Sequence, residues 1–206
     1  MVGGAETIVS VAYPNAVVAA TSPRREELLE RAYAYVLEHG LTTLSLRPLA
    51  GAIGSSPRVL LFLFGSKDEL VRALLARARA EELDLLRRIE PAGAGLPAVT
   101  AELWAWLAAP EHRALLTLWV EGYARSLVEP EGAWAGFARA TVEDWLDLLA
   151  AAQPANRRAT AAGAAERTVA LAVLRGAFLD LLATGDAERT GAAVARWAAR
   201  PGAAGS

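Results

Sequence analysis

Cysteine is absent from this chain of 206 residues, and histidine occurs only twice, as His39 and His112. Without cysteine, the chain can form neither a disulfide framework nor a thiolate metal site. Two histidines are also little material for a histidine-based metal or catalytic site. We therefore expect no bound metal and no cofactor. The lack of cysteine also fits a protein of the reducing cytoplasm.

Long hydrophobic runs and excess positive charge are absent as well. No stretch of about 18 uninterrupted apolar residues occurs, so we expect no membrane span. The 21 lysines and arginines are matched by 23 aspartates and glutamates, for a formal net charge of −2. Within residues 1–70, six basic residues stand against seven acidic ones. This balance counts modestly against nucleic-acid binding, because phosphate neutralisation supplies much of the nonspecific affinity.

From residue 22 onward the hydrophobic pattern is helical, and no strand-like alternation of apolar and polar residues occurs. With 54% hydrophobic and 21% charged residues, the composition is that of a globular protein. We therefore predict an all-α fold, with a loop over residues 153–158. The expected helices cover residues 22–40, 45–53, 56–64, 66–89, 96–109, 111–128, 131–152, 159–183 and 187–200.

The most informative stretch covers residues 45–70, SLRPLAGAIGSSPRVLLFLFGSKDEL. Ser45 is placed to cap a short helix, and Gly54 provides a tight turn because it has no Cβ. Ser56 caps the next helix, and Pro57 occupies its first position, where a missing N–H costs nothing. Two short helices around such a turn form a helix-turn-helix, whose second helix enters a DNA major groove. The following S-x-x-E sequence from Ser66 predicts a capping box and another helix.

This arrangement resembles the DNA-binding domain of the TetR-type bacterial repressors. The resemblance covers residues 24–75, and its most specific parts are the S-L-R-x-L-A-x-x-x-G and F-G-S-K-D-E-L segments. It implies an N-terminal three-helix helix-turn-helix domain followed by a larger helical ligand-binding and dimerisation bundle. The sequence departs from the family at Leu61-Phe62-Leu63, where TetR-like domains commonly carry Tyr and His that touch the DNA backbone. Leu61 cannot donate a hydrogen bond to a phosphate, so that contact is absent or replaced.

The predicted organisation has four parts. Residues 1–21 show no helical stripe and are expected to form a flexible arm. Residues 22–70 form the helix-turn-helix domain, residues 71–200 the ligand-binding and dimerisation domain, and residues 201–206 a tail. The boundary lies inside the long helix that starts near Ser66, which connects the two domains directly.

The candidate DNA contacts lie on the helix-turn-helix and at the starts of its helices. Arg58, in the first turn after Pro57, is placed to reach a guanine edge or a phosphate. Lys67 and the free amides at the start of the next helix suit a phosphate. The full set of expected DNA-binding residues is Arg24, Ser45, Arg47, Ser55, Ser56, Pro57, Arg58, Leu61, Phe62 and Lys67.

The C-terminal part is rich in large aromatic residues, which fit either plain core packing or an apolar ligand pocket between helices. The resemblance implies the pocket, for an unknown small-molecule effector. Polar residues set among them, such as Thr117, Glu121, Asp144 and Arg175, are candidates for orienting a ligand, although Glu121 with Arg125 fits a surface pair better. The expected ligand-binding residues are Trp104, Trp119, Tyr123, Trp145 and Phe178.

The helix over residues 164–182 is apolar nearly all round, so it must be buried on several sides. A second copy of the chain is the natural cover, and with the helix over 131–152 it would form a four-helix dimer interface. A twofold dimer also suits a palindromic operator. The expected interface residues are Trp145, Leu149, Leu171, Leu174 and Phe178.

Enzymatic activity is not expected. Glu143 and Asp144 are adjacent on a helix and point apart, and Glu81-Glu82 has the pattern of a solvated face. No glycine-rich phosphate loop follows a strand. We therefore predict a homodimeric transcriptional regulator, a repressor that binds a palindromic double-stranded DNA operator, is released from it by a small apolar or aromatic ligand, and binds no membrane. The alternative is a helical protein-interaction module of the same fold without DNA binding, which the neutral charge and the leucine-rich second helix favour.

Overall fold

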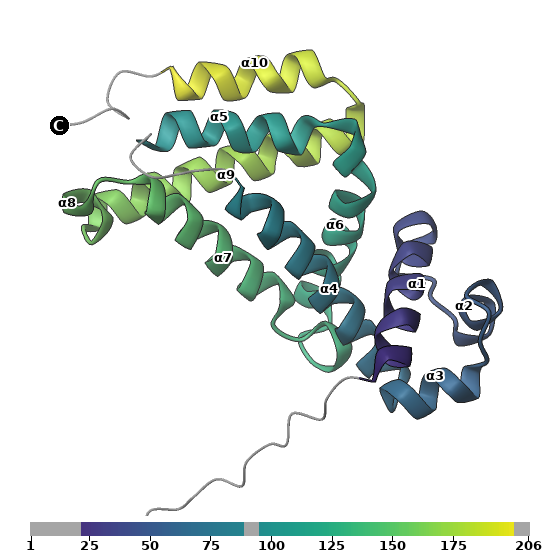
Figure 1. Cartoon of the computed structure of the whole chain (residues 1–206). Helices are drawn as coiled ribbons and strands as arrows, with labels where there is room; N and C mark the ends of the chain where they lie inside the picture. Colours follow the sequence, from purple (N-terminus) through teal and green to yellow (C-terminus); the bar gives the residue numbers. More distant parts are fainter. Residues whose placement is uncertain (1–21, 89–94, 200–206) are drawn as a thin grey trace, which may run out of the picture.

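The computed structural model describes residues 22–88 and 95–199, apart from the side chains of residues 85–87. All regular structure in these ranges is helical, which confirms the predicted all-α class (Figure 1). The expected arm (1–21) and tail (201–206) lie outside the described residues. The α-helices are α1 (Pro23–His39), α2 (Leu46–Ala52), α3 (Pro57–Phe64), α4 (Lys67–Arg87), α5 (Gly95–Ala108), α6 (Arg113–Val128), α7 (Phe137–Ala152), α8 (Ala155–Arg158), α9 (Ala161–Thr184) and α10 (Ala187–Ala198).

Helices α1, α2 and α3 form a small unit at one end of the molecule (Figure 1). Ser56 Oγ accepts a hydrogen bond from the backbone N–H of Val59 at 3.3 Å and so caps α3 as predicted. Gly54 forms the turn between α2 and α3 with φ at +67°, a conformation that favours glycine. Ser45 precedes α2, but its side chain makes no capping bond, contrary to our expectation. The buried residues that the three helices share are Leu28, Ala32, Val36, Leu49, Leu60 and Phe64.

Helix α4 joins this unit to the larger bundle: it contacts α1 and α3, and also α6 and α7 (Figure 1). Ser66 Oγ accepts a hydrogen bond from the Glu69 N–H at 3.1 Å, so the predicted cap is present. The Glu69 carboxylate pairs with Arg72 instead of returning to Ser66, so the capping box is only half formed. We expected Leu85 and Ile89, at the far end of this helix, to lie near the aromatic bundle, but the Leu85 side chain and the whole of Ile89 lie outside the described structure.

The larger bundle is built from α5, α6, α7, α9 and α10. Helices α5, α9 and α10 contact one another pairwise, while α4 and α7 extend from them toward the small unit (Figure 1). Helix α6 returns from α5 to α1. It approaches α4 and α7 closely at Gly122, where an added Cβ would lie 2.8 Å from Leu75 Cδ2 and 3.0 Å from Phe137 Cε1. In the part of the chain that the structure describes, no helix is both long and apolar enough for a bilayer crossing.

Two boundaries differ from the sequence prediction. The expected helix over 131–152 is interrupted: a short 3-10 turn, Gly132–Trp134, is followed by Gly136 at φ +74°, and α7 begins only at Phe137. Glycine with positive φ before the first helical residue changes the chain direction, which periodicity alone does not reveal. The expected loop over 153–158 contains the one-turn helix α8.

Candidate functional site

Helix α3 presents an exposed face of mixed chemistry. Arg58 is exposed in its first turn, and Phe62, one turn later, is 85% exposed. Leu61 is also exposed, at 41%, whereas Leu60 and Phe64 on the other side of α3 are buried in the core. Val59, Leu61 and Phe62 together form an exposed apolar patch on α3, which makes this face a candidate contact surface.

Charge is distributed unevenly over the small unit. No acidic residue occurs between Glu38 and Asp68, so α2, α3 and their turns carry only the basic side chains Arg47 and Arg58. The acidic side chains lie on α1 and at the start of α4. The helix-turn-helix therefore contains no acidic residue, which the near-neutral net charge of residues 1–70 did not reveal.

The predicted DNA-binding residues occupy different environments. Arg24 pairs with Glu27 at 2.7 Å, and Arg31 holds the same carboxylate at 2.7 Å, so the Arg24 guanidinium is already engaged. Ser56 is occupied as the α3 cap, and Ser55 Oγ is buried without a hydrogen-bond partner. Pro57 is half-buried. The remaining residues of the set are exposed: Ser45, Arg47, Arg58, Leu61, Phe62 and Lys67.

A second candidate site is an internal cavity between α4, α5, α6, α7 and α9. Its volume is about 10 Å³, which is room for about one water molecule. Three of the predicted ligand-binding residues line it, Trp119, Trp145 and Phe178. Trp104 does not line it and packs instead beside Gly191 of α10. The full lining is Glu82, Leu107, Leu116, Trp119, Trp145, Leu174, Arg175 and Phe178.

Glu82 is the main surprise of this cavity. It was expected on a solvated face, but it is only 4% exposed, and its Oε1 accepts a hydrogen bond from Trp145 Nε1 at 2.7 Å. Burial raises the pKa of the Glu82 carboxyl to about 7, although the Trp145 hydrogen bond acts in the opposite direction. Its spacing carried the signal, because Glu82 continues the buried stripe of Val71, Leu75 and Ala78.

Arg175 enters the cavity from α9. Its Nη1 donates to Tyr123 Oη at 3.3 Å, and its guanidinium carbon lies 5.6 Å from the centre of the Trp119 ring and 5.1 Å from that of Tyr123. Tyr123 therefore contacts Arg175, which lines the cavity, but Tyr123 itself does not line it. Burial lowers the pKa of Arg175. Its Nη2 and the Nε1 of Trp119 are both buried without a hydrogen-bond partner.

Between the two sites, α6 touches the end of α1. Glu121 Oε2 accepts a hydrogen bond from the backbone N–H of Leu41 at 2.7 Å. The predicted surface pair of Glu121 with Arg125 is wrong, since Arg125 pairs with Glu129 instead. Asp144, another expected ligand-orienting residue, is held by Arg79 with contacts of 2.5 and 2.8 Å.

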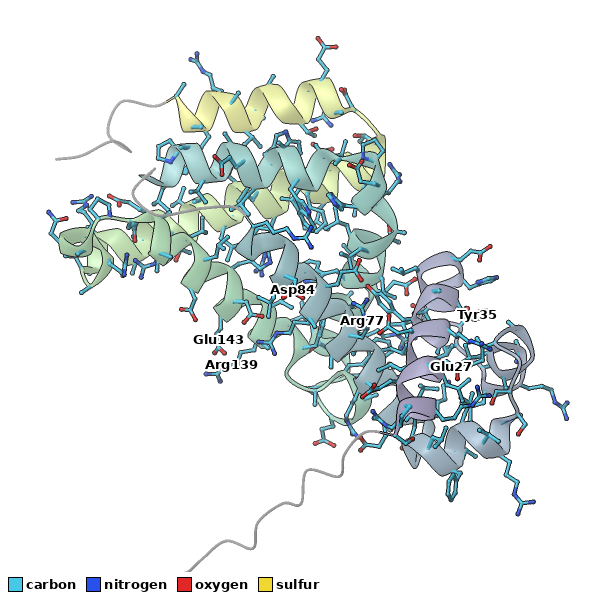
Figure 2. The ribbon with its side chains drawn as sticks, in the orientation of Figure 1. Glu27, Tyr35, Arg77, Asp84, Arg139 and Glu143 are labelled. Atoms are coloured by element: carbon cyan, nitrogen blue, oxygen red, sulfur yellow. The ribbon has the colours of Figure 1, made fainter. Side chains whose placement is uncertain are left out.

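A second junction joins α4 to α1. Arg77 contacts Glu30 at 2.7 Å and Glu81 at 2.9 Å, and it lies 4.6 Å from the centre of the Tyr33 ring. Figure 2 shows Arg77 at the crossing of α4 and α1, whereas Arg139 lies on the outside of α7. The small unit is thus tied to the bundle by an ion-pair cluster as well as by the Leu41–Glu121 hydrogen bond.

The predicted dimer-interface residues are inside their own chain. None of the five is more than 5% exposed, because α9 turns one side onto α5 and α7. Our assignment of Trp145, Leu149, Leu171, Leu174 and Phe178 to an intermolecular contact is therefore wrong. The opposite side of α9 is exposed, and its residues are small or apolar: Ala165, Val169, Ala172, Gly176, Leu179 and Ala183.

An open groove adjoins that side of α9. It has a volume of about 800 Å³ and runs between α9 and α6. Its walls are mainly apolar, with Leu179 on one side and Val120, Ala124 and Val128 on the other. Val128 is 77% exposed, so the groove extends the uncovered apolar surface of α9 onto α6.

Comparison with known proteins gives structural neighbours only, since no family model and no curated protein matches the chain. A transcriptional regulator from Rhodococcus sp. Rha1 superimposes with a TM-score of 0.70 at 20% identity, over 84% of this chain and 93% of that one. A TetR transcription regulator from Haloarcula marismortui gives 0.67 at 19% identity, over 85% and 96%.

A third neighbour is the multidrug binding protein EbrR, solved in complex with imidazole. It superimposes with a TM-score of 0.63 at 25% identity, over 88% of this chain and 94% of that one. All three neighbours match nearly their whole length, so the likeness includes both the small N-terminal unit and the larger bundle. The resemblance seen in the sequence is thereby confirmed: this chain has the fold of the TetR-family transcriptional regulators.

Proposed function

We propose that the protein is a cytoplasmic transcriptional repressor that binds a palindromic operator as a homodimer and is released by a small molecule. The observation that carries this proposal is the α2–turn–α3 arrangement with its exposed, acid-free face. Helix α3 is the element that enters the major groove. The TetR-type fold of the whole described chain supports the same function.

Two side chains of α3 are suited to direct recognition of bases. The Arg58 guanidinium matches the two acceptors of a guanine edge, and the Phe62 ring suits a thymine methyl group. Phosphate contacts fall to Arg47 and to Lys67 with the free amides at the start of α4. Leu61 occupies a position that makes a polar backbone contact elsewhere in the family, and here it offers an apolar one.

The outer side of α9 supports a twofold dimer. Ala172 and Gly176 leave room for the backbone of a second helix, and Val169 and Leu179 provide apolar area, with 50% and 47% of each exposed. In a closed dimer the same patch on each copy meets its counterpart. The groove beside α6 would then receive side chains from the partner's α9.

The internal cavity supports control by a small molecule. The neighbour EbrR is described as a multidrug binding protein and has been solved with imidazole and with proflavin. Here the corresponding effector would enter between α4, α6, α7 and α9. Because the cavity is nearly closed, binding has to displace side chains or helices, and such a displacement is what a switch requires.

Selection of bound sequences from random double-stranded DNA tests the proposal. The parent protein should enrich a palindrome whose half-sites are about 34–36 Å apart, with binding that weakens as salt rises. A double variant, Arg58→Ala with Phe62→Ala, should enrich nothing while its helical content is unchanged. If the parent protein also enriches no sequence, the proposal fails, and the alternative of an interaction module without DNA binding takes its place.

A further inference from the structure

The polar groups of the internal cavity are unbalanced. Among the described residues, Arg175 Nη2 and Trp119 Nε1 are buried donors without an acceptor, and Trp119 is only 7% exposed. The one acidic group of the cavity, Glu82, already accepts a hydrogen bond from Trp145. A buried donor without a partner costs free energy that a suitable acceptor recovers. Arg175 Nη2 and Trp119 Nε1 are therefore the two groups of the cavity whose hydrogen bonds a ligand oxygen would complete.

We propose that this cavity, which has room for about one water molecule as it stands, opens to bind an aromatic carboxylate, whose oxygens accept hydrogen bonds from Arg175 Nη2 and Trp119 Nε1. The inference rests on the proposed function of a ligand-responsive regulator and names the chemical class of its effector. The apolar body of the ligand would lie against Leu107, Leu116 and Phe178. A carboxylate is favoured over a neutral acceptor, because hydrogen bonds between charged partners are roughly twice as strong as neutral ones.

A cationic ligand fits this cavity less well. The guanidinium of Arg175 would repel it, and the cation–π positions on the Trp119 and Tyr123 rings are already taken by Arg175. Glu82 could attract a cation only when ionised, and one of its oxygens is then still held by Trp145.

Protonation of Glu82 gives the proposal a second observable. The charged groups near Glu82 are Asp144, which raises its pKa, and Arg175 and Arg79, which lower it. Arg79 is already paired with Asp144. An anion placed beside Glu82 disfavours the ionised carboxyl, so ligand binding should be accompanied by proton uptake. With the pKa of Glu82 near 7 before binding, the affinity should fall as the pH rises above that value.

Isothermal titration of the full chain with three matched probes tests the ligand class. The probes are 1-naphthoate, 1-naphthamide and 1-naphthylmethylammonium, which share one aromatic body and differ in the polar group. The carboxylate should bind at least about tenfold more tightly than the amide, and the ammonium most weakly. Equal or tighter binding of the amide or the ammonium, or no measurable binding of the carboxylate, would overturn the proposal.

Two substitutions assign the contact to its residues. Arg175→Met keeps the apolar stem and should weaken naphthoate binding by about tenfold or more, with little change for naphthamide. Arg175→Lys keeps the charge and should give an intermediate loss. Thermal melting of each variant checks the fold, and an equal loss for the carboxylate and the amide would show that Arg175 only supports the packing.

The pH dependence provides an independent check. Between about pH 6 and about pH 8, naphthoate affinity of the parent should fall by up to about tenfold per unit. Glu82→Gln should bind naphthoate with an affinity that no longer varies with pH over this range. An unchanged pH profile in this variant would remove Glu82 from the proposal. Failure of these ligand tests leaves the DNA selection experiment untouched, so the two proposals can fail separately.

Discussion

The backbone N–H of Leu41, just after α1, donates a 2.7 Å hydrogen bond to the carboxylate of Glu121 on α6. Glu121 lies two residues after Trp119, which lines the internal cavity, and two residues before Tyr123, which binds Arg175. One helix therefore touches the cavity with one set of side chains and the helix-turn-helix unit with another. A movement of α6 caused by a ligand would reach Leu41 through this hydrogen bond.

The chain geometry at this contact depends on Gly40. Its φ of +78° and ψ of 168° fall in a region open almost only to glycine, and an added Cβ would lie 2.8 Å from Glu121 Oε1. Gly40→Ala should therefore lower the free energy of unfolding by about 1–3 kcal/mol, measured by urea denaturation.

Gly51→Ala is the matched control for Gly40→Ala. Gly51 lies within α2, and an added Cβ there would meet nothing within 4 Å. This substitution should leave stability unchanged or raise it by up to about 1 kcal/mol, because alanine is the better helix former. Equal effects of the two substitutions would contradict the conformational role of Gly40.

Arg58→Ala should weaken binding to the selected operator by about 1–3 kcal/mol if the guanidinium reads a base edge. Its stability should be unchanged, because Arg58 is exposed in the first turn of α3. Fluorescence anisotropy with labelled operator measures the affinity. Arg139→Ala on the outside of α7, far from α3 (Figure 2), is the control of equal charge change. A variant that binds as tightly as the parent would leave Arg58 without a role in recognition.

The double substitution Val169→Glu with Leu179→Glu should convert the proposed dimer to a monomer without unfolding it. Both side chains are about half exposed on the outer side of α9, so two carboxylates are tolerated in the free chain. In a dimer they would be buried and unpaired, which costs several kcal/mol. Sedimentation velocity at micromolar concentration measures the oligomeric state.

Two outcomes would argue against this interface. A monomeric parent would exclude a stable dimer, and a double variant that stays dimeric would move the interface away from the outer side of α9. Ala34→Glu, on the exposed face of α1, controls for the effect of one added carboxylate away from α9. Glutamate at Leu174 or Phe178 is no test of dimerisation, because these side chains are buried in the chain's own core and the substitutions should unfold it.

The sequence predicted best what local rules decide. The Ser56 cap, the position of Pro57 at the start of α3 and the positive φ of Gly54 depend on a few neighbouring residues, and all three occur as expected. The order of the helices and the resemblance of the N-terminal unit follow from such signals. These local features were enough to predict the all-α fold class.

The sequence predicted contacts between distant segments poorly. The partner of Glu82 is 63 residues away and the partner of Glu121 is 80 residues away, so no local pattern identified either. Helix α9 is apolar on nearly all sides, and its periodicity could not tell which side faces its own chain. That is why the predicted interface included Leu174 and Phe178 and omitted Val169 and Leu179.

Glu82 should make stability depend on pH. Its pKa is about 7 in the folded chain against the ordinary value of 4.5, so the folded protein keeps a proton that the unfolded chain releases between these values. The free energy of unfolding should therefore fall as the pH rises through this window, by an amount on the order of 3 kcal/mol, and level off above it. Glu82→Gln keeps an acceptor for Trp145 Nε1 but does not titrate.

The difference in unfolding free energy between Glu82→Gln and the parent isolates this contribution, since all other groups titrate in both proteins. The variant should gain stability relative to the parent as the pH rises from about 4.5 to about 7. Urea denaturation at several pH values measures it. A difference that is constant over this range would mean that the Glu82 carboxyl titrates alike in the folded and unfolded chains.

Glu121→Ala should weaken the coupling between the cavity and the operator. In the parent, an effector such as 1-naphthoate should lower operator affinity by about 5–150-fold, and the operator should lower effector affinity by the same factor. Without the hydrogen bond to Leu41, this factor should fall toward one while each ligand alone still binds. Glu129→Ala, near the end of the same helix, removes an exposed carboxylate that pairs only with Arg125 in the described structure, and should leave the factor unchanged. Operator anisotropy with and without effector gives one side of the cycle, and effector titration with and without operator gives the other. An unchanged factor in Glu121→Ala would leave the Arg77 cluster and α4 as the route between the two sites.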